Sequence, residues 1–138
     1  MAANTLPIFT LVGDIQWGAT VLATANTAKD GTGTVLTVFT ADATNGGYVT
    51  KVVFRAAGTC IATVARLFIN NGSPNGTAAN NILFAELPLP ATTLSETAQL
   101  AGQEIPLGFA LPPGYKLNCT VGTTVSAGYY ISTIGGKY

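Results

Sequence analysis

Short runs of β-branched and aromatic residues recur along this 138-residue chain, and Gly, Asn, Asp or Pro separates them. No long stretch repeats apolar residues at helical spacing between capping residues. The pattern therefore predicts an all-β fold of about eight strands. The expected strands are Thr20–Ala25, Val35–Ala41, Tyr48–Ala57, Cys60–Ile69, Ile82–Leu87, Ile105–Leu111, Leu117–Val121 and Tyr129–Ile134.

Prolines and glycines predict where these strands end or lie at an edge. Pro88 is expected to end the fifth strand, because proline cannot donate a hydrogen bond to a ladder. Pro106 and Pro112 predict that the sixth strand lies at the edge of a sheet. The Gly135-Gly136 step is expected to break the last strand.

The connections predict how the strands are arranged. Ala91–Gln103 lacks a strand pattern and is expected to cross from one sheet to another, with a short helical turn at Ser95–Gln99 as the alternative. Asn70–Asn81 is polar and should be an exposed loop. We expect a single-domain antiparallel β-sandwich, jelly-roll-like, over residues 19–138. Met1–Gly18 is either an apolar arm that reaches a partner or an extra strand on the domain's own sheet.

Charge is scarce on this chain. Charged residues make up 9% of it, against about 25% in an average soluble domain, and the six basic and six acidic side chains leave a formal net charge of +0. A free monomer with so little charge tends to associate, so we expect part of the surface to be covered in an assembly. The alternative is a monomer kept in solution by its Thr, Asn, Ser and Gly residues.

The same balance argues against several partners. The basic residues are scattered, whereas nucleic acid and anionic lipid both require clustered Lys and Arg. No uninterrupted apolar run approaches the roughly 18 residues of a membrane span, and no secretion signal is visible. We expect no nucleic acid or membrane partner and synthesis in a reducing cytoplasm, where Cys60 and Cys119 would be free, buried thiols.

The residues that usually carry catalysis are missing or isolated. The chain has no histidine, which removes the commonest general base and metal ligand. Cys60 and Cys119 lack the spacing of a zinc or redox site. Six carboxylates are present, but Asp30 and Asp42 occupy positions where turns favour aspartate. We predict no enzymatic activity, no cofactor and no metal.

Large apolar side chains supply the candidates for a contact surface. Phe54, Phe68, Phe84 and Phe109 fall within predicted strands and are expected to fill the core. For Trp17 and the late tyrosines, core and interface are equally open. The predicted interface residues are Leu6, Ile8, Phe9, Leu11 and Trp17 in the N-terminal segment and Tyr129, Tyr130 and Tyr138 near the other end.

Four segments carry a resemblance: KVVFR at residues 51–55, RLFINNG at 66–72, LPPGYKL at 111–117 and GYYISTIGGKY at 128–138. Together they resemble small β-rich virion proteins of tailed bacteriophages, over roughly Thr34 to Tyr138. The resemblance implies a head decoration (cement) protein on the capsid surface of the virion. Its implied partners are copies of itself, often as a trimer, and the major capsid protein. Met1–Thr34 is not covered, so no capsid-facing residues follow.

Other binding roles fit the same sequence. One is a tail-fibre or receptor-binding module, in which the loop Asn70–Asn81 would meet a host glycan or protein. Another is a lectin-like domain that binds a glycan on its own.

Overall fold

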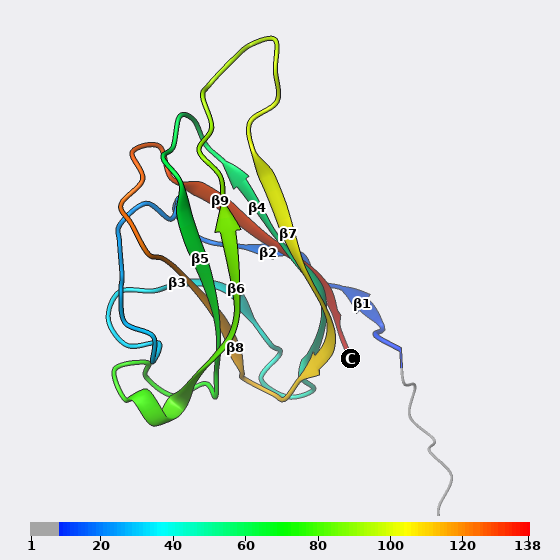
Figure 1. The fold of residues 1–138 in the computed structure, drawn as a ribbon. Coiled ribbons are helices and arrows are strands. Elements are labelled where there is room, and N and C mark those ends of the chain that lie inside the picture. The colour runs from blue at the N-terminus through cyan, green and yellow to red at the C-terminus, as the bar shows by residue number, and fades with distance from the viewer. Residues whose placement is uncertain (1–8) are drawn as a thin grey trace, which may run out of the picture.

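Two antiparallel sheets face each other across one core in the computed structural model, which describes residues 9–138 (Figure 1). Sheet A has the order β1-β9-β4-β7, with β2 also paired to β9, and sheet B has the order β3-β8-β5-β6. The strands are β1 (Val12–Gly13), β2 (Gln16–Trp17), β3 (Leu36–Thr40), β4 (Gly47–Ala56), β5 (Thr63–Asn70), β6 (Asn81–Leu89), β7 (Gly102–Leu111), β8 (Lys116–Val121) and β9 (Tyr129–Lys137).

This strand order confirms the predicted fold class. If β1 and β2 are counted as one interrupted strand, each sheet has four strands. The chain passes repeatedly from one sheet to the other, as in a jelly roll. The stretch between β6 and β7 crosses from sheet B to sheet A and projects beyond the strands in Figure 1. The crossing was predicted, and the alternative helical turn is not found there. β7 is the edge strand of sheet A, as its prolines predicted.

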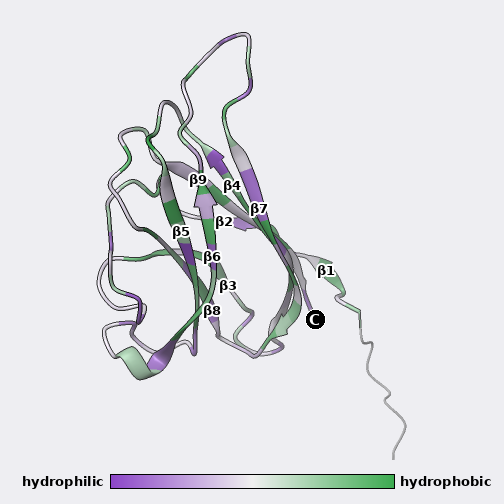
Figure 2. Ribbon diagram, in the orientation of Figure 1, coloured by the Kyte–Doolittle hydropathy of each residue, from purple (hydrophilic) through white to green (hydrophobic). Residues whose placement is uncertain are grey.

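The core lies between the inner faces of the two sheets. Val49, Val52 and Phe54 of β4 in sheet A and Leu117 and Cys119 of β8 in sheet B belong to one core cluster, and all five are essentially fully buried. Figure 2 shows hydrophobic and hydrophilic residues interleaved along the strands. The alternation follows from the two-residue period of a strand, which sends successive side chains to opposite faces.

One expected strand and two expected strand ends are wrong. The segment Thr20–Ala25 makes only isolated bridges, at Leu22 and Ala25. β6 continues through Pro88 to Leu89, which an edge strand tolerates because one side of it needs no donor.

β9 also continues where a break was expected, through Gly135-Gly136 to Lys137. Gly135 pairs with Val49 at the point where the register of β4 shifts. A Cβ atom at Gly135 would collide with the Tyr48 carbonyl oxygen. The glycine therefore lets the two backbones approach closely and extends the strand instead of ending it.

Phe84 corrects the predicted core. Phe54 and Phe68 are fully buried, but Phe84 is 48% exposed. Its ring packs edge-on against Phe109 with centroids 5.2 Å apart, so it partly covers the open side between β6 and β7. β6 forms one edge of sheet B, and β7 forms one edge of sheet A. An inward position at an edge has a neighbour on one side only and stays half-exposed.

The described part of the N-terminal segment forms an extra strand, in two pieces, on sheet A. β1 and β2 pair with β9, and Gln16 also reaches sheet B. Its side-chain amide donates to the Thr40 carbonyl at 2.9 Å and accepts from the Thr40 amide at 2.9 Å. The buried Thr133 hydroxyl lies 3.1 Å from the carbonyl oxygens of both Gln16 and Val38. These contacts tie the two sheets together along one side.

Candidate functional site

Exposed apolar side chains gather on the N-terminal segment and the neighbouring strand β9. Phe9 is 77% exposed, Leu11 71% and Trp17 70%, while Val12 and Ile15 between them are also exposed. Hydrophobic residues colour β1 at this outer edge in Figure 2. We define the N-terminal strip as Phe9, Leu11, Val12, Ile15, Trp17 and Tyr130.

Pairing with β9 brings the two most prominent aromatic residues of the strip together. Trp17 lies directly opposite Ser132, and Tyr130 is two residues further along the same face of β9. Such diagonal neighbours on a sheet have side chains roughly 7–8 Å apart, within reach of aromatic rings. Arg55 of β4 lies opposite Tyr130 on the same outer face. Trp, Tyr and Arg are the residues most often found at the energetic centre of protein interfaces.

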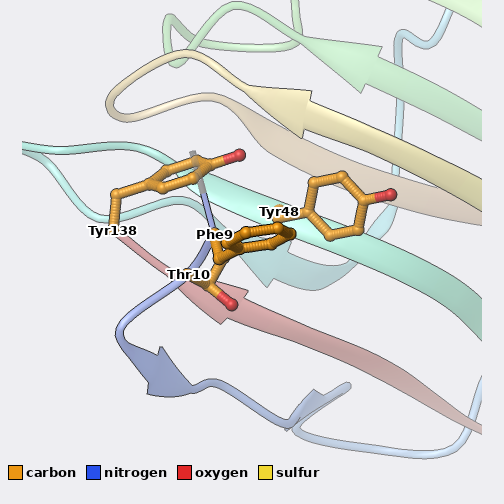
Figure 3. A pocket seen from close by; sticks show the side chains of 4 residues that line it. All are labelled: Phe9, Thr10, Tyr48 and Tyr138. Carbon is orange, nitrogen blue, oxygen red and sulfur yellow. The ribbon is translucent and has the colours of Figure 1, made fainter. Parts of the chain in front are cut away.

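A hollow lies on the outer face of sheet A, beside the strip. It has a volume of about 380 Å³ and is lined by Phe9, Thr10, Tyr48 and Tyr138. Figure 3 shows the Phe9 ring between the rings of Tyr138 and Tyr48. We call this site the aromatic hollow.

Small residues around Tyr48 make the hollow possible. Tyr48 lies opposite Ala110 on β7 and Gly136 on β9. A Cβ atom at Gly108 would lie 3.5 Å from the Tyr48 hydroxyl, so the ring extends over a glycine of the next strand. Thr10 passes closer still over Gly136, where a Cβ atom would clash with its side chain. The outer face of sheet A is therefore recessed at these small residues, and the aromatic rings surround the recess.

The predicted interface residues meet different outcomes. Leu6 and Ile8 lie outside the described residues. Phe9, Leu11, Trp17 and Tyr130 are exposed together along one side of sheet A. Tyr138 lines the aromatic hollow.

Tyr129 is a correction to the predicted interface. Its side chain is 0% exposed and belongs to the core. It occupies the first position of β9, and from there residues 129, 131 and 133 point inward while Tyr130 points outward. Two adjacent tyrosines in a strand cannot share a face, so only the second can contribute to a contact surface.

Sequence reasoning missed Val12, Ile15 and Tyr48. Val12 and Ile15 lie in the same apolar segment as the predicted residues, so that segment's composition already carried the signal. Tyr48 was missed because its role depends on Gly108, Ala110 and Gly136. These residues are remote in sequence and become neighbours only through strand register.

Charged residues adjoin the strip at Asp14, Arg55 and Lys137, and others form pairs on the strands of the two sheets. Lys51 of β4 pairs with Glu104 of β7 at 3.0 Å in sheet A, and Arg66 of β5 pairs with Glu86 of β6 at 2.9 Å in sheet B. The Gln16 amide donates to Asp14 at 3.0 Å. Among residues 9–138, the side chains that line the hollow are uncharged.

The loop between β5 and β6 is held by its asparagines. The Asn75 amide donates to the carbonyl oxygens of Gly31 and Gly33 at 3.0 and 2.8 Å, and the Asn81 amide donates to the Asn75 carbonyl at 2.9 Å. The Asn70 amide donates to the Asn81 side chain at 2.7 Å. The amide groups of these three asparagines are therefore hydrogen-bonded to other groups of the protein instead of being free to bind a ligand.

Both cysteines of the described residues lie in the core. Cys60 and Cys119 are free and buried, and burial raises the pKa of the Cys119 thiol, which keeps it from acting as a nucleophile. No three potential metal-ligating side chains come together in these residues. The same part of the chain contains no helix that could cross a membrane.

Comparison with known proteins returns no relative: no protein-family model, curated protein or solved structure matches the chain.

Proposed function

We propose that this chain is a non-enzymatic structural protein of a virion that decorates a bacteriophage head and cements the junctions between capsid subunits. The observation that carries the proposal is the N-terminal strip, in which Phe9, Leu11 and Trp17 are each at least 70% exposed. Apolar groups collected in this way mark a contact surface for protein. The phage head is the assembly indicated by the sequence resemblance.

The size of the strip suits a stable contact. Its three aromatic side chains can each bury about 150–250 Å². With the three aliphatic ones, and in proportion to their exposure, they offer an area on the order of 700 Å², against about 800 Å² on each side of a standard protein interface. One copy would therefore bind moderately, and many copies on a head would add their stabilisation by mass action.

The structure offers less support for the roles in receptor or glycan binding. Both depend on free polar side chains in the loop Asn70–Asn81, and three of its amides donate to other groups of the protein. Of the eleven exposed large hydrophobic side chains in residues 9–138, six lie instead on the N-terminal strip.

The proposal is tested by binding to purified heads that lack the protein. Trp17→Ala and Tyr130→Ala each remove a central side chain of the strip. The double variant is expected to bind heads at least tenfold more weakly, because truncating such residues costs about 2 kcal/mol or more at an interface centre. Co-sedimentation with the heads measures the affinity.

Ile61→Ala is the matched control, because Ile61 is 61% exposed and lies outside the strip. It should bind heads as the wild type does. Equal losses for the control and the double variant would show that the strip is not the contact surface. No binding by the wild-type protein would refute the proposal.

A further inference from the structure

The aromatic hollow has the chemistry of a site for an uncharged peptide. Three of its four lining side chains are aromatic, and Thr10, Tyr48 and Tyr138 carry hydroxyl groups that can donate hydrogen bonds. Its volume of about 380 Å³ falls within the range of about 300–1,000 Å³ typical of ligand sites. An anionic ligand would need a cation in the lining, and none of the four described lining residues is one.

Proline is the residue that this lining fits best. A prolyl residue offers an apolar ring and a carbonyl acceptor but no N–H group, so it needs donors and aromatic surface from its site. Aromatic-lined grooves bind proline-containing segments in extended conformation for this reason. Sugar recognition would call for amide or carboxylate side chains beside the rings, and the four lining residues that the structure describes have neither.

We propose that the aromatic hollow binds the segment Leu6–Pro7–Ile8 of a second copy of this chain. The segment is uncharged and places its proline between two aliphatic residues. The residue before a proline favours extended backbone, as this kind of recognition requires. The inference goes beyond the proposed function, on which it rests only in taking the same face as a contact surface.

The position of the segment supports a second copy as its source. Leu6–Pro7–Ile8 directly precedes Phe9, which forms a wall of the hollow. Pro7 lies two residues from Phe9, at most about 7 Å along an extended chain. Two copies that meet over their aromatic hollows, beside the N-terminal strip, would therefore bring each segment close to the other copy's hollow. The zero formal net charge of the chain imposes no overall repulsion between copies.

The test measures self-association of the full chain in solution, without phage heads. Sedimentation equilibrium is expected to give a mass above that of one chain. Pro7→Ala and Tyr138→Ala should each weaken self-association at least tenfold, and the double variant should be no weaker than the worse single one, because both act on one contact. Ile61→Ala serves as the control and should associate as the wild type does.

A synthetic peptide of residues 2–8 provides a second readout. It should bind the wild-type chain and not the Tyr138→Ala variant, and circular dichroism should show that this variant remains folded. A monomeric wild-type chain, or peptide binding unaffected by Tyr138→Ala, overturns the inference.

Head binding by the same variants separates this inference from the proposed function. A chain that saturates heads but does not self-associate overturns the second copy as occupant and leaves the decoration role standing. A chain that self-associates through the hollow but does not bind heads refutes the decoration role and leaves the second copy as the occupant of the hollow.

Discussion

At the scale of single residues, Tyr129 has an unusual combination of burial and polarity. Its side chain is 0% exposed, and its hydroxyl has no hydrogen-bond partner among the described residues. Burial, with a contribution from Cys60, raises the pKa of this tyrosine, so it stays neutral. A buried polar group without a partner costs about 1–3 kcal/mol.

Tyr129→Phe is therefore expected to raise the free energy of unfolding by about 1 kcal/mol, since it removes the hydroxyl and keeps the ring. Urea denaturation measures the change. Tyr130→Phe is the control and should have almost no effect, because Tyr130 is exposed. A clear loss of stability in Tyr129→Phe would mean that the hydroxyl is hydrogen-bonded.

Asp42 gives the fold a dependence on acid pH. Hydrogen bonds from the backbone amides of Asn45 and Thr44 hold its pKa below the usual value. A carboxyl group with a lower pKa in the folded state contributes stability above its unfolded pKa of about 3.9 and loses it as the pH falls through the folded pKa.

Asp42→Asn keeps an acceptor for both amides and removes this titration. We expect the difference in melting temperature between wild type and variant to shrink as the pH falls below about 4. Thermal melts over a series of acid pH values measure the difference. A difference that stays constant across the series would contradict the assignment.

At the scale of elements, Gln16 determines how firmly the N-terminal segment is attached. Its side chain forms two hydrogen bonds with the backbone of Thr40, so it links β2 in sheet A to β3 in sheet B. Gln16→Ala is expected to lower the free energy of unfolding by about 1 kcal/mol, because water replaces the side chain as the partner of the exposed Thr40 backbone groups.

Hydrogen exchange at the Gly18 amide, which donates to the Ile131 carbonyl, reports on the same segment and should speed up in Gln16→Ala. The exposed Gln99 gives the matched control, Gln99→Ala, which should leave both measurements unchanged. Unchanged exchange in Gln16→Ala would show that β2 is held by its pairing with β9 alone.

The elements also show what could be predicted from sequence. Strand existence, the crossing after β6 and the edge position of β7 all depend on local patterns, so they were predictable. The continuation of β9 through Gly135 was not, because it depends on close approach to Tyr48 of β4. The aromatic hollow stayed hidden for the same reason, since its floor is set by the register of three strands.

At the scale of the whole molecule, the scarcity of charge and the exposed N-terminal strip both indicate a surface that another protein covers. The strip occupies one side of sheet A, while the core between the sheets is filled by other residues. Sequence composition predicted a covered surface but not its location. Four of the eight candidate contact residues lie together on the strip, and pairing with β9 is what brings Tyr130 beside Trp17.

We propose that this protein binds and stabilises a phage head. The most direct measurement mixes the purified chain with heads that lack it, pellets the particles, counts bound copies and records the melting temperature of the heads. We predict saturable binding in a fixed number of copies per head and a higher melting temperature, because a ligand that binds only the assembled state stabilises it. Heads that bind no protein and melt at an unchanged temperature would contradict the claim.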